Sequence, residues 1–369
     1  MAVRVLVADD SAFMRRQLTQ MIESDPGLTV VGIARNGQEA IDKVKELEPD
    51  VVTLDINMPA MDGLTALTYI MIERPTPCLV ISSLTQEGAL STFEALELGA
   101  VDYVAKPSGT ISLNIEQQAA EIVAKIRVAA RARLRGRRFL SHRRHIERTA
   151  RIERSPNGHN VNLPVVGIGV STGGPQTLLE ILPLLPPDLS APVVIVQHMP
   201  AGFTNAFARR LDEACAIRVK EAENNDPLVP GQAYLAPGGY QMTVVHSILG
   251  RGPVVNLSDR PRGLTFCPSV DVLFESVAKL FGPRSVCVLL TGMGDDGARG
   301  MVQVSRAGGI TIAESEKTAI VFGMPREAIE RGGAQVVAPA YEIADQILKG
   351  LSHIVEASRR SSQVAVRRS

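Results

Sequence analysis

The sequence has no long apolar run. No stretch reaches the about 18 consecutive apolar residues that a membrane-spanning helix requires, so we expect no membrane insertion. The first residues, MAVRVLVADDSAF, lack the apolar core and the small-residue cleavage site of a signal peptide. Both absences favour a cytoplasmic location.

Cysteine is scarce, and the balance of charge is even. The four cysteines are far apart and form no C-x-x-C pair, which favours reduced thiols over a disulfide framework or a zinc site. Lysine and arginine number 39, as do aspartate and glutamate, so no net charge attracts the chain to nucleic acid or to a membrane.

Apolar strand-like runs alternate with amphipathic helical runs over residues 1–125. Near-continuous apolar strands between helices are typical of a parallel sheet that is covered on both faces, so we predict an α/β domain. The expected strands are Val3–Ala8, Thr29–Ile33, Val51–Leu54, Cys78–Ile81 and Val101–Val104.

The alternation stops in residues 126–162, where ten arginines and only two acids precede Ser155 from residue 131 onward. We predict a basic linker there, because blocks of like charge are usually solvated. A transcriptional regulator that binds DNA through this segment is an alternative. The segment has no helix-turn-helix signature and a single aromatic residue, Phe139, so we expect no specific nucleic-acid partner.

A second α/β domain is predicted over residues 163–354, followed by a disordered tail over 355–369. We expect this domain to be doubly wound and mainly parallel. Residues 240–259 predict a β-hairpin that turns at Gly250-Arg251-Gly252-Pro253. The other expected strands are Val165–Gly169, Val193–Val196, Val286–Leu290 and Gly309–Ala313.

Polar residues stand where the strands of the first domain end. Asp9 and Asp10 follow the first strand, Asp55 ends the third, Ser82 ends the fourth and Lys106 follows the fifth. The carboxyl ends of parallel strands meet at one edge of a sheet, so these side chains are expected to converge. Any one of these aspartates alone is as typical of a turn or a helix cap as of a binding site. Together, three carboxylates favour Mg²⁺, and the lysine and hydroxyl suit a phosphoryl group.

The first domain resembles the receiver domain of two-component response regulators. The segments that carry the resemblance are VLVADDSAFMRR, LDINMPAMDG, VISS and GAVDYVAKP. The resemblance implies a flavodoxin-like fold in which Asp55 accepts a phosphoryl group from a histidine kinase. It also implies that the backbone carbonyl of Asn57 joins Asp9, Asp10 and Asp55 around Mg²⁺. Lys106 would bind the phosphoryl group, and Ser82 and Tyr103 would act as switch residues.

The second domain opens with VVGIGVSTGGP at residues 165–175, an apolar run that breaks into glycines around a serine. A dinucleotide loop would need a third glycine where Thr172 stands, and the next strand ends in Gln197-His198 instead of an acid. A Walker A lysine is also missing. Nucleotide binding by a Rossmann-like sensor remains an alternative that tight NAD or ATP binding would support.

A nucleophilic role for Ser171 needs a base and a residue that orients it. His198 follows the second strand of this domain, and the Gly-rich turn after a later strand carries Asp295 and Asp296. All of these positions lie at the carboxyl edge of one sheet, where the side chains can meet. The order serine, histidine, aspartate differs from that of α/β-hydrolases, despite the G-x-S-x-G match, so we expect another scaffold.

The whole chain, apart from linker and tail, resembles the chemotaxis protein-glutamate methylesterases of the CheB family. The segments are GVSTGGP, VQHMP, YLAPGG, PSVDVLF and LLTGMGDDGARG. The resemblance implies Ser171 as the nucleophile, His198 as the base and Asp296 as its orienting acid, with the Met293 amide in the oxyanion hole. Phe266-Cys267 departs from the His-Arg pair expected before PSVD, which leaves substrate preference near this loop open.

The resemblance also implies the reaction and its partners. The substrate would be a glutamate γ-methyl ester on the cytoplasmic helical bundle of a chemoreceptor, and methanol would be released. Some members of the family also deamidate glutamine. The esterase would need no cofactor, whereas the receiver would need Mg²⁺. We expect the receiver to restrain the esterase until the histidine kinase phosphorylates Asp55.

Overall fold

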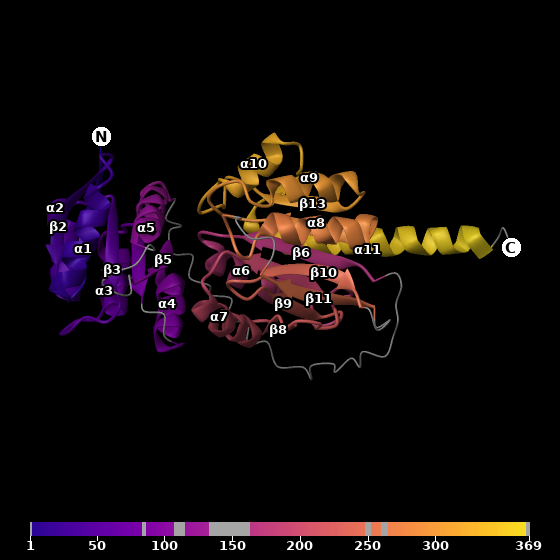
Figure 1. The fold of residues 1–369 in the computed structure, drawn as a ribbon, viewed down its shortest axis with the longest axis horizontal. Coiled ribbons are helices and arrows are strands. Elements are labelled where there is room, and N and C mark those ends of the chain that lie inside the picture. The colour runs from indigo at the N-terminus through magenta and orange to yellow at the C-terminus, as the bar shows by residue number, and fades with distance from the viewer. Residues whose placement is uncertain are drawn as a thin grey trace. The chain divides into compact units, whose positions relative to one another are not determined.

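The computed structural model describes residues 2–82, 86–106, 115–132, 163–247, 252–259 and 265–366, without the side chains of 86–87, 115–118 and 359–366. Two compact units divide the chain, Met1–Phe139 and Leu140–Ser369 (Figure 1). The predicted basic linker falls almost wholly outside the described residues, as does the turn Gly250-Arg251 of the predicted hairpin.

The first unit is a five-stranded parallel sheet with helices on both faces. The strand order β2-β1-β3-β4-β5 is that of flavodoxin-like folds, as the sequence predicts. Every predicted strand is present to within one residue at each end. The strands are β1 Val3–Ala8, β2 Leu28–Ala34, β3 Val51–Asp55, β4 Cys78–Ser82 and β5 Asp102–Ala105.

The helices of this unit begin at side-chain caps. Ser11, Asn36 and Asp62 each accept a hydrogen bond from a backbone N–H in the first turn of the helix that follows. Their apolar faces pack on a sheet whose β3 and β4 are wholly buried. The helices are α1 Ala12–Glu23, α2 Gly37–Leu47, α3 Gly63–Glu73, α4 Gln86–Leu98 and α5 Ile115–Ala129.

The second unit is built on a seven-stranded sheet of order β14-β13-β12-β6-β7-β9-β8. Every described pairing in this sheet is parallel. The chain starts at β6 in the centre and winds outward in both directions, which makes the fold doubly wound. The strands are β6 Val165–Val170, β7 Val193–Gln197, β8 Arg218–Glu221, β9 Gln232–Leu235, β12 Ser285–Leu289, β13 Ile310–Glu314 and β14 Val336–Ala338.

A separate antiparallel ribbon carries the predicted hairpin. β10 Gln241–His246 pairs with β11 Pro253–Ser258 and with no strand of the large sheet among the described residues. The ribbon packs on α8, and together with α9 they bury one continuous apolar core against the sheet. The helical elements are α6 Gly174–Ile181, η1 Leu182–Leu184, α7 Ala201–Ala214, α8 Val270–Phe281, η2 Gly282–Arg284, α9 Ala298–Arg306, α10 Met324–Glu330 and α11 Ala340–Val366.

The last helix differs from the sequence prediction. α11 continues to Val366, so residues 355–366 are helical where a disordered tail was expected. No glycine or proline follows Gly350, and nothing in this polar stretch therefore stops a helix that packing has already started. Residues 367–369 lie outside the described part of the chain.

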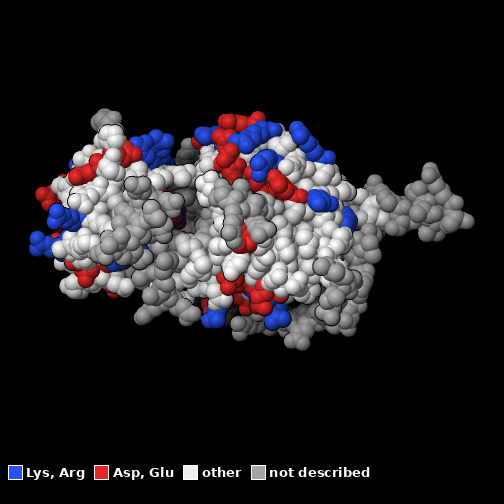
Figure 2. Space-filling view, in the orientation of Figure 1, with Lys and Arg blue, Asp and Glu red and all other residues white. Residues whose placement is uncertain are grey.

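Charges of both signs stand next to each other along the upper edge of the second unit in Figure 2, the region of α9 and α10. Around α10, for example, Arg331 pairs with Asp295 and Arg326 with Glu330, so red and blue atoms stand side by side there. Such exposed pairs contribute little to stability, but they prevent a large field of one sign. None of the described helices has the length and apolarity required to cross a bilayer.

Candidate active site

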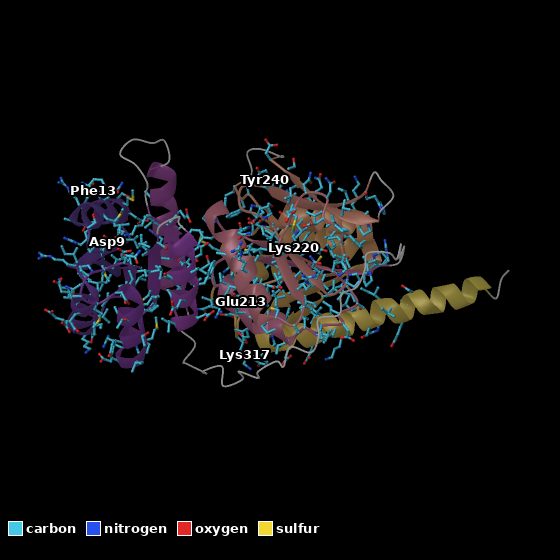
Figure 3. The ribbon with its side chains drawn as sticks, turned by 90° about the horizontal axis from the view of Figure 1, so that it is seen from below. Asp9, Phe13, Glu213, Lys220, Tyr240 and Lys317 are labelled. Carbon is cyan, nitrogen blue, oxygen red and sulfur yellow. The ribbon has the colours of Figure 1, made fainter. Side chains whose placement is uncertain are left out.

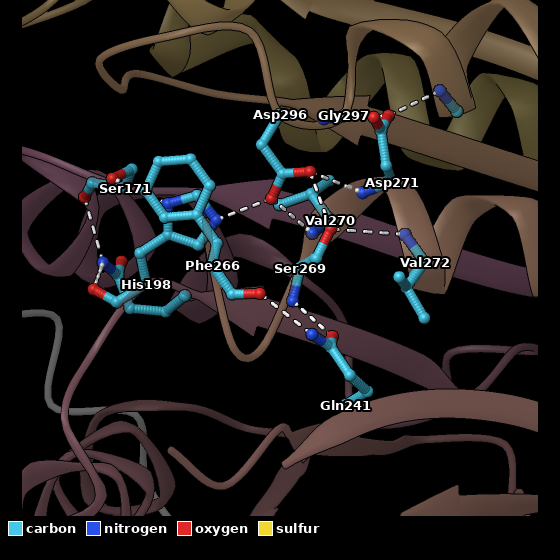
Figure 4. A network of polar contacts seen from close by, with 12 residues as sticks. Ser171, His198, Gln241, Phe266, Ser269, Val270, Asp271, Val272, Asp296 and Gly297 are labelled. Carbon is cyan, nitrogen blue, oxygen red and sulfur yellow. Dashed lines mark hydrogen bonds and ion pairs between the residues drawn. The ribbon is translucent and has the colours of Figure 1, made fainter. Parts of the chain in front are cut away.

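A serine, a histidine and an aspartate meet at the carboxyl edge of the seven-stranded sheet. Ser171 follows β6, His198 follows β7 and Asp296 lies in the loop between β12 and α9. These three strands are adjacent at the centre of the sheet, so their loops converge. His198 Nδ1 lies 3.1 Å from Ser171 Oγ, and its Nε2 lies 2.8 Å from Asp296 Oδ2 (Figure 4).

These two contacts fix the orientation and the tautomer of the histidine. Turning the ring by 180° would put carbon atoms opposite Ser171 and Asp296, and both hydrogen bonds would be lost. An ionised Asp296 can only accept, so Nε2 carries the hydrogen and Nδ1 presents a lone pair to the Ser171 hydroxyl. The neutral ring is therefore arranged to take a proton from the serine.

The first turn of α8 holds the Asp296 carboxylate. Oδ2 accepts from the Val270 N–H at 2.7 Å, and Oδ1 accepts from the Ser269 hydroxyl at 2.8 Å and the Asp271 N–H at 3.0 Å. Burial alone would raise the pKa of Asp296, but the hydrogen bond and electrostatic attraction of His198, with the Asp271 and Val270 N–H donors, lower it overall. The acid thus stays ionised and fixed in position.

Helices α8 and α9 cap each other around this carboxylate. Asp296 stands just before α9 and accepts from the first N–H groups of α8. Asp271, in the first turn of α8, accepts from Gly297, the N-cap of α9, and from Gly300 in its first turn. Burial raises the pKa of Asp271, with Asp296 adding to the effect, while the Gly300 N–H opposes it. The Asp296 and Asp271 carboxylates thus each lie at the positive N-terminus of a helix, and their hydrogen bonds hold the loop before α9 against the start of α8.

A tight turn presents Ser171. Its N–H donates to the Thr291 carbonyl at 2.9 Å, and its own carbonyl accepts from the Gly174 N–H at 2.8 Å and from the buried Gln197 amide at 3.0 Å. Gly173 has φ +76°, and a Cβ there would lie 2.7 Å from the Ile320 side chain. A glycine is therefore required to turn the chain into α6.

The segment predicted to supply the oxyanion donor lies against Ser171. A Cβ on Gly292 would lie 2.8 Å from Ser171 Cβ and 2.3 Å from Met324 Sδ. Within the described residues the Met293 N–H donates to no protein acceptor, whereas the Gly292 N–H donates to Val321. An amide without a partner beside a nucleophile is what an oxyanion site requires.

We expect Gly292→Ala to lower kcat about 100-fold, because a displacement of about 1 Å at a reacting centre costs that much. The added methyl has no space between Ser171 and Met324, so the loop must move away from the nucleophile. Steady-state kinetics and thermal unfolding would be measured together. Gly350→Ala in α11 is the control, since the nearest atoms to its methyl are ends of the Val286 and Ile310 side chains, at 3.1 and 3.4 Å. A Gly292→Ala chain with unchanged kcat would contradict this placement of the loop.

Three aspartates cluster at the carboxyl edge of the first unit. Ligand oxygens of Asp9, Asp10 and Asp55 lie within 4.8 Å of one another. Asp9 and Asp55 are buried at the ends of adjacent strands, and Asp9 is labelled in Figure 3. Hard carboxylate oxygens in this arrangement fit Mg²⁺, which takes a few such ligands and fills its remaining positions with water or phosphate oxygens.

Lys106 reaches into the same cluster. Its Nζ lies 2.7 Å from Asp55 Oδ2 and 3.3 Å from Asp9 Oδ2. Burial raises the pKa of Asp55, and Lys106 partly offsets this. For Lys106, burial works against the charge, but Asp55 and Asp9 outweigh it and raise its pKa. The lysine therefore stays charged next to the carboxylate that the sequence predicts as the phosphoryl acceptor.

The remaining predicted receiver residues lie on or after the neighbouring strands, and Asn57 contacts the cluster directly. The Asn57 N–H donates to Asp55 Oδ1 at 3.3 Å, and the buried Ser82 hydroxyl donates to the Gly88 carbonyl at 3.1 Å. The buried Tyr103 ring lies on β5 with the Lys125 ammonium 5.2 Å from its centre. The hydroxyl of Ser82 is thus turned toward α4 here, although its strand lies next to that of Asp55.

Comparison with known proteins agrees with the two-unit fold. The family model for CheB methylesterase matches residues 166–347, and that for the response regulator receiver domain matches residues 5–116. The protein-glutamate methylesterase/protein-glutamine glutaminase of Caldanaerobacter subterraneus subsp. tengcongensis is 51% identical over 96% of this chain and 98% of its own length. The chain belongs to the CheB methylesterase family.

Other CheB relatives extend the similarity. The protein-glutamate methylesterase/protein-glutamine glutaminase of Pyrococcus abyssi is 46% identical over 95% of this chain and 94% of its own length. The crystal structure of the Thermotoga maritima CheB methylesterase catalytic domain is 40% identical, with a TM-score of 0.49, and is matched over 51% of this chain and 98% of that one. The CheB family thus gives the chain's enzyme class, protein-glutamate methylesterase and protein-glutamine glutaminase, behind a receiver domain.

The structure adds contacts that sequence reasoning about this CheB chain missed. Ser269 binds Asp296, Gln197 ties the backbones of Ser171 and His198 together, and Phe266 stacks on His198. Ser269 carried a signal, because a serine just before an apolar helical run is a typical N-cap. Gln197 carried none, and Phe266 stood out only as a departure from the expected His-Arg pair, because the contacts of both depend on which loops lie side by side.

Proposed function

We propose that Ser171, His198 and Asp296 form a catalytic triad that hydrolyses glutamate γ-methyl esters on the cytoplasmic helical bundle of chemoreceptors. The observation that carries the proposal is the continuous hydrogen-bonded chain from the serine hydroxyl through the imidazole to the carboxylate. A nucleophile, a base and a fixed anion in contact are the groups that acyl transfer requires.

The geometry supports a two-step reaction. Ser171 Oγ attacks the ester carbonyl as its proton moves to His198 Nδ1, and the Met293 N–H would donate to the resulting oxyanion. The imidazolium returns the proton to the methoxy oxygen, methanol leaves and an acyl-enzyme remains. Water then attacks that ester, gives its proton to Nδ1 and releases the glutamate side chain, with Ser171 regaining its hydrogen.

Deamidation of receptor glutamines would follow the same route, with ammonia as the leaving group. Nδ1 then protonates an amide nitrogen instead of an ester oxygen, and the acyl-enzyme is identical. A cytoplasmic location accompanies this proposal, because the proposed substrate bundle and the phosphodonor kinase are both cytoplasmic.

Methanol release from a chemoreceptor bundle tests the substrate. We expect the full chain to release methanol from a methylated bundle fragment, and to release ammonia from the same fragment with glutamine at those positions. Hydrolysis of a small glutamate methyl ester, without any reaction on the folded bundle, would contradict the chemoreceptor substrate but not the triad.

The first unit would control the enzyme through Asp55. Its carboxylate would accept a phosphoryl group from a chemotaxis histidine kinase, with Lys106 in position to bind the phosphoryl oxygens. Bound Mg²⁺, held by Asp9, Asp10, Asp55 and the Asn57 carbonyl, would neutralise charge on the transferring group. The added negative charge would relieve restraint on the esterase, and Ser82 and Tyr103 would respond to it.

We expect acetyl phosphate with Mg²⁺ to raise the rate of methanol release, and Asp55→Asn to reduce the ratio of stimulated to unstimulated rate to unity. An amide cannot accept the phosphoryl group, so the phosphodonor has nothing to act on. Asp42→Asn, on the exposed side of α2, serves as the control and should keep the full ratio. Stimulation that persists in Asp55→Asn would mean that another residue is phosphorylated.

A further inference from the structure

We propose that Phe266 is a positioning residue of the esterase, which keeps the His198 ring in its plane and stabilises that ring when it is protonated. The proposal depends on the role of His198 proposed above. It concerns how the base is held, and no part of the two-step reaction assigns a task to Phe266.

The two rings lie face to face. Their centroids are 4.1 Å apart and their planes differ by 6°, as Figure 4 shows beside the hydrogen bonds of His198. Only 9% of the His198 side chain is exposed. Ser171 and Asp296 occupy the two edges of the imidazole, and Phe266 covers one of its faces.

The loop that carries Phe266 is fixed by a buried amide. Gln241, at the start of β10 and 1% exposed, donates from Nε2 to the Phe266 carbonyl at 2.9 Å. Its Oε1 accepts from the Ser269 N–H at 2.8 Å. The next residue, Cys267, accepts at its carbonyl from the Gly239 N–H at 3.1 Å. The backbone at Phe266 is therefore held in place by its hydrogen bond to Gln241 and by that of Cys267 to Gly239.

The same short segment also determines where the acid lies. Ser269 follows Phe266 by three residues, and its hydroxyl donates to Asp296. The acid at one edge of His198 and the ring on its face are thus both fixed relative to the start of α8. A shift of this segment would move both together, so the arrangement around the base is preserved as a unit.

The stacked ring of Phe266 restrains a motion of the His198 imidazole that the two hydrogen bonds hardly resist. Hydrogen bonds at Nδ1 and Nε2 resist sliding within the ring plane, but they resist tilting out of it only weakly. The face of Phe266 blocks that tilt on its side. When Nδ1 takes the proton of Ser171, the ring becomes a cation within the distance at which an aromatic face attracts positive charge. This attraction strengthens only as the proton moves, so it lowers the barrier and leaves substrate binding unchanged.

We expect Phe266→Leu to lower kcat roughly tenfold, which corresponds to a barrier that is higher by about 1.4 kcal/mol, with KM unchanged. Leucine keeps apolar cover over the base but has no aromatic face. Phe266→Tyr keeps the face, so its kcat should stay within about twofold of the parent chain, on the same reasoning. The assay is methanol release by the full chain from the methylated bundle fragment, with melting temperatures measured alongside.

The controls separate this proposal from a structural role and from the triad itself. Tyr341→Leu removes an exposed aromatic ring from α11 and should not change kcat. Phe266→Met is a second non-aromatic variant, used if the leucine chain does not fold. Wild-type kcat in a folded leucine or methionine chain, an equal loss in Phe266→Tyr, or a change in KM alone would overturn the role of Phe266. Activity that survives Ser171→Ala would instead overturn the triad.

Discussion

Ser171→Ala is expected to reduce methanol release by on the order of 10⁴-fold or more, the scale of loss when a triad nucleophile is removed. Without the hydroxyl no acyl-enzyme can form, and His198 has no proton to accept. What remains is the contribution of substrate positioning and of the donors near Met293. The loss should appear in kcat, because the methyl group of alanine leaves the surrounding turn intact.

The turn at Ser171 is held through its backbone, which alanine retains, so the variant should fold and bind substrate as before. Binding of the bundle fragment and the melting temperature would verify this. Ser352→Ala is a matched control, because that serine lies on α11 and donates only to a carbonyl of its own helix. A Ser171→Ala chain that still releases methanol at the parent rate would exclude Ser171 as the nucleophile.

Asp296→Asn is expected to lower kcat about 10³- to 10⁴-fold, as the loss of a triad carboxylate does elsewhere. An amide is neutral and can present its NH₂ group to Nε2, which would favour hydrogen on Nδ1 and remove the lone pair that faces Ser171. The adjacent Asp295→Asn is the control. Asp295 is 61% exposed and pairs with Arg331, so its loss should leave kcat close to that of the parent chain.

The same substitution should change how stability depends on pH. The pKa of Asp296 is lowered in the folded chain relative to the value of about 3.9 for an unfolded aspartate. The carboxylate therefore adds stability above that value, and this contribution is lost as the pH falls through the lower, folded pKa. Urea unfolding at pH 7 and below pH 4 should show a smaller acid-induced loss in Asp296→Asn. An identical loss in both chains would mean that Asp296 gains no stability from its ionisation.

The sequence predicts the strands that are long and apolar. Nine strands of the two parallel sheets appear to within one residue of the expected bounds, because wholly buried strands such as β6 and β12 need unbroken apolar runs. β8, β9 and β14 were not predicted. Each has only three or four residues, and β8 reads RVKE, so neither length nor alternation distinguishes them from loops.

Site residues could be predicted wherever they follow strands. Ser171 and His198 stand directly after β6 and β7, so strand assignment alone places both at one edge. The use of Nδ1 rather than Nε2 toward Ser171 could not be predicted, because it depends on the direction from which the imidazole enters the site. The contact between Phe266 and His198 joins residues 68 positions apart through a loop whose path only the folded chain determines.

The mutual capping of α8 and α9 means that folding and catalysis impose requirements on one carboxylate. Asp296 neutralises the end of a helix that carries much of the apolar core of its unit, and it also binds His198, the proposed base. Selection for a stable fold and selection for a fast enzyme thus act on the same atoms. A substitution that disturbs the packing of α8 on α9 would therefore both weaken the apolar core and displace His198.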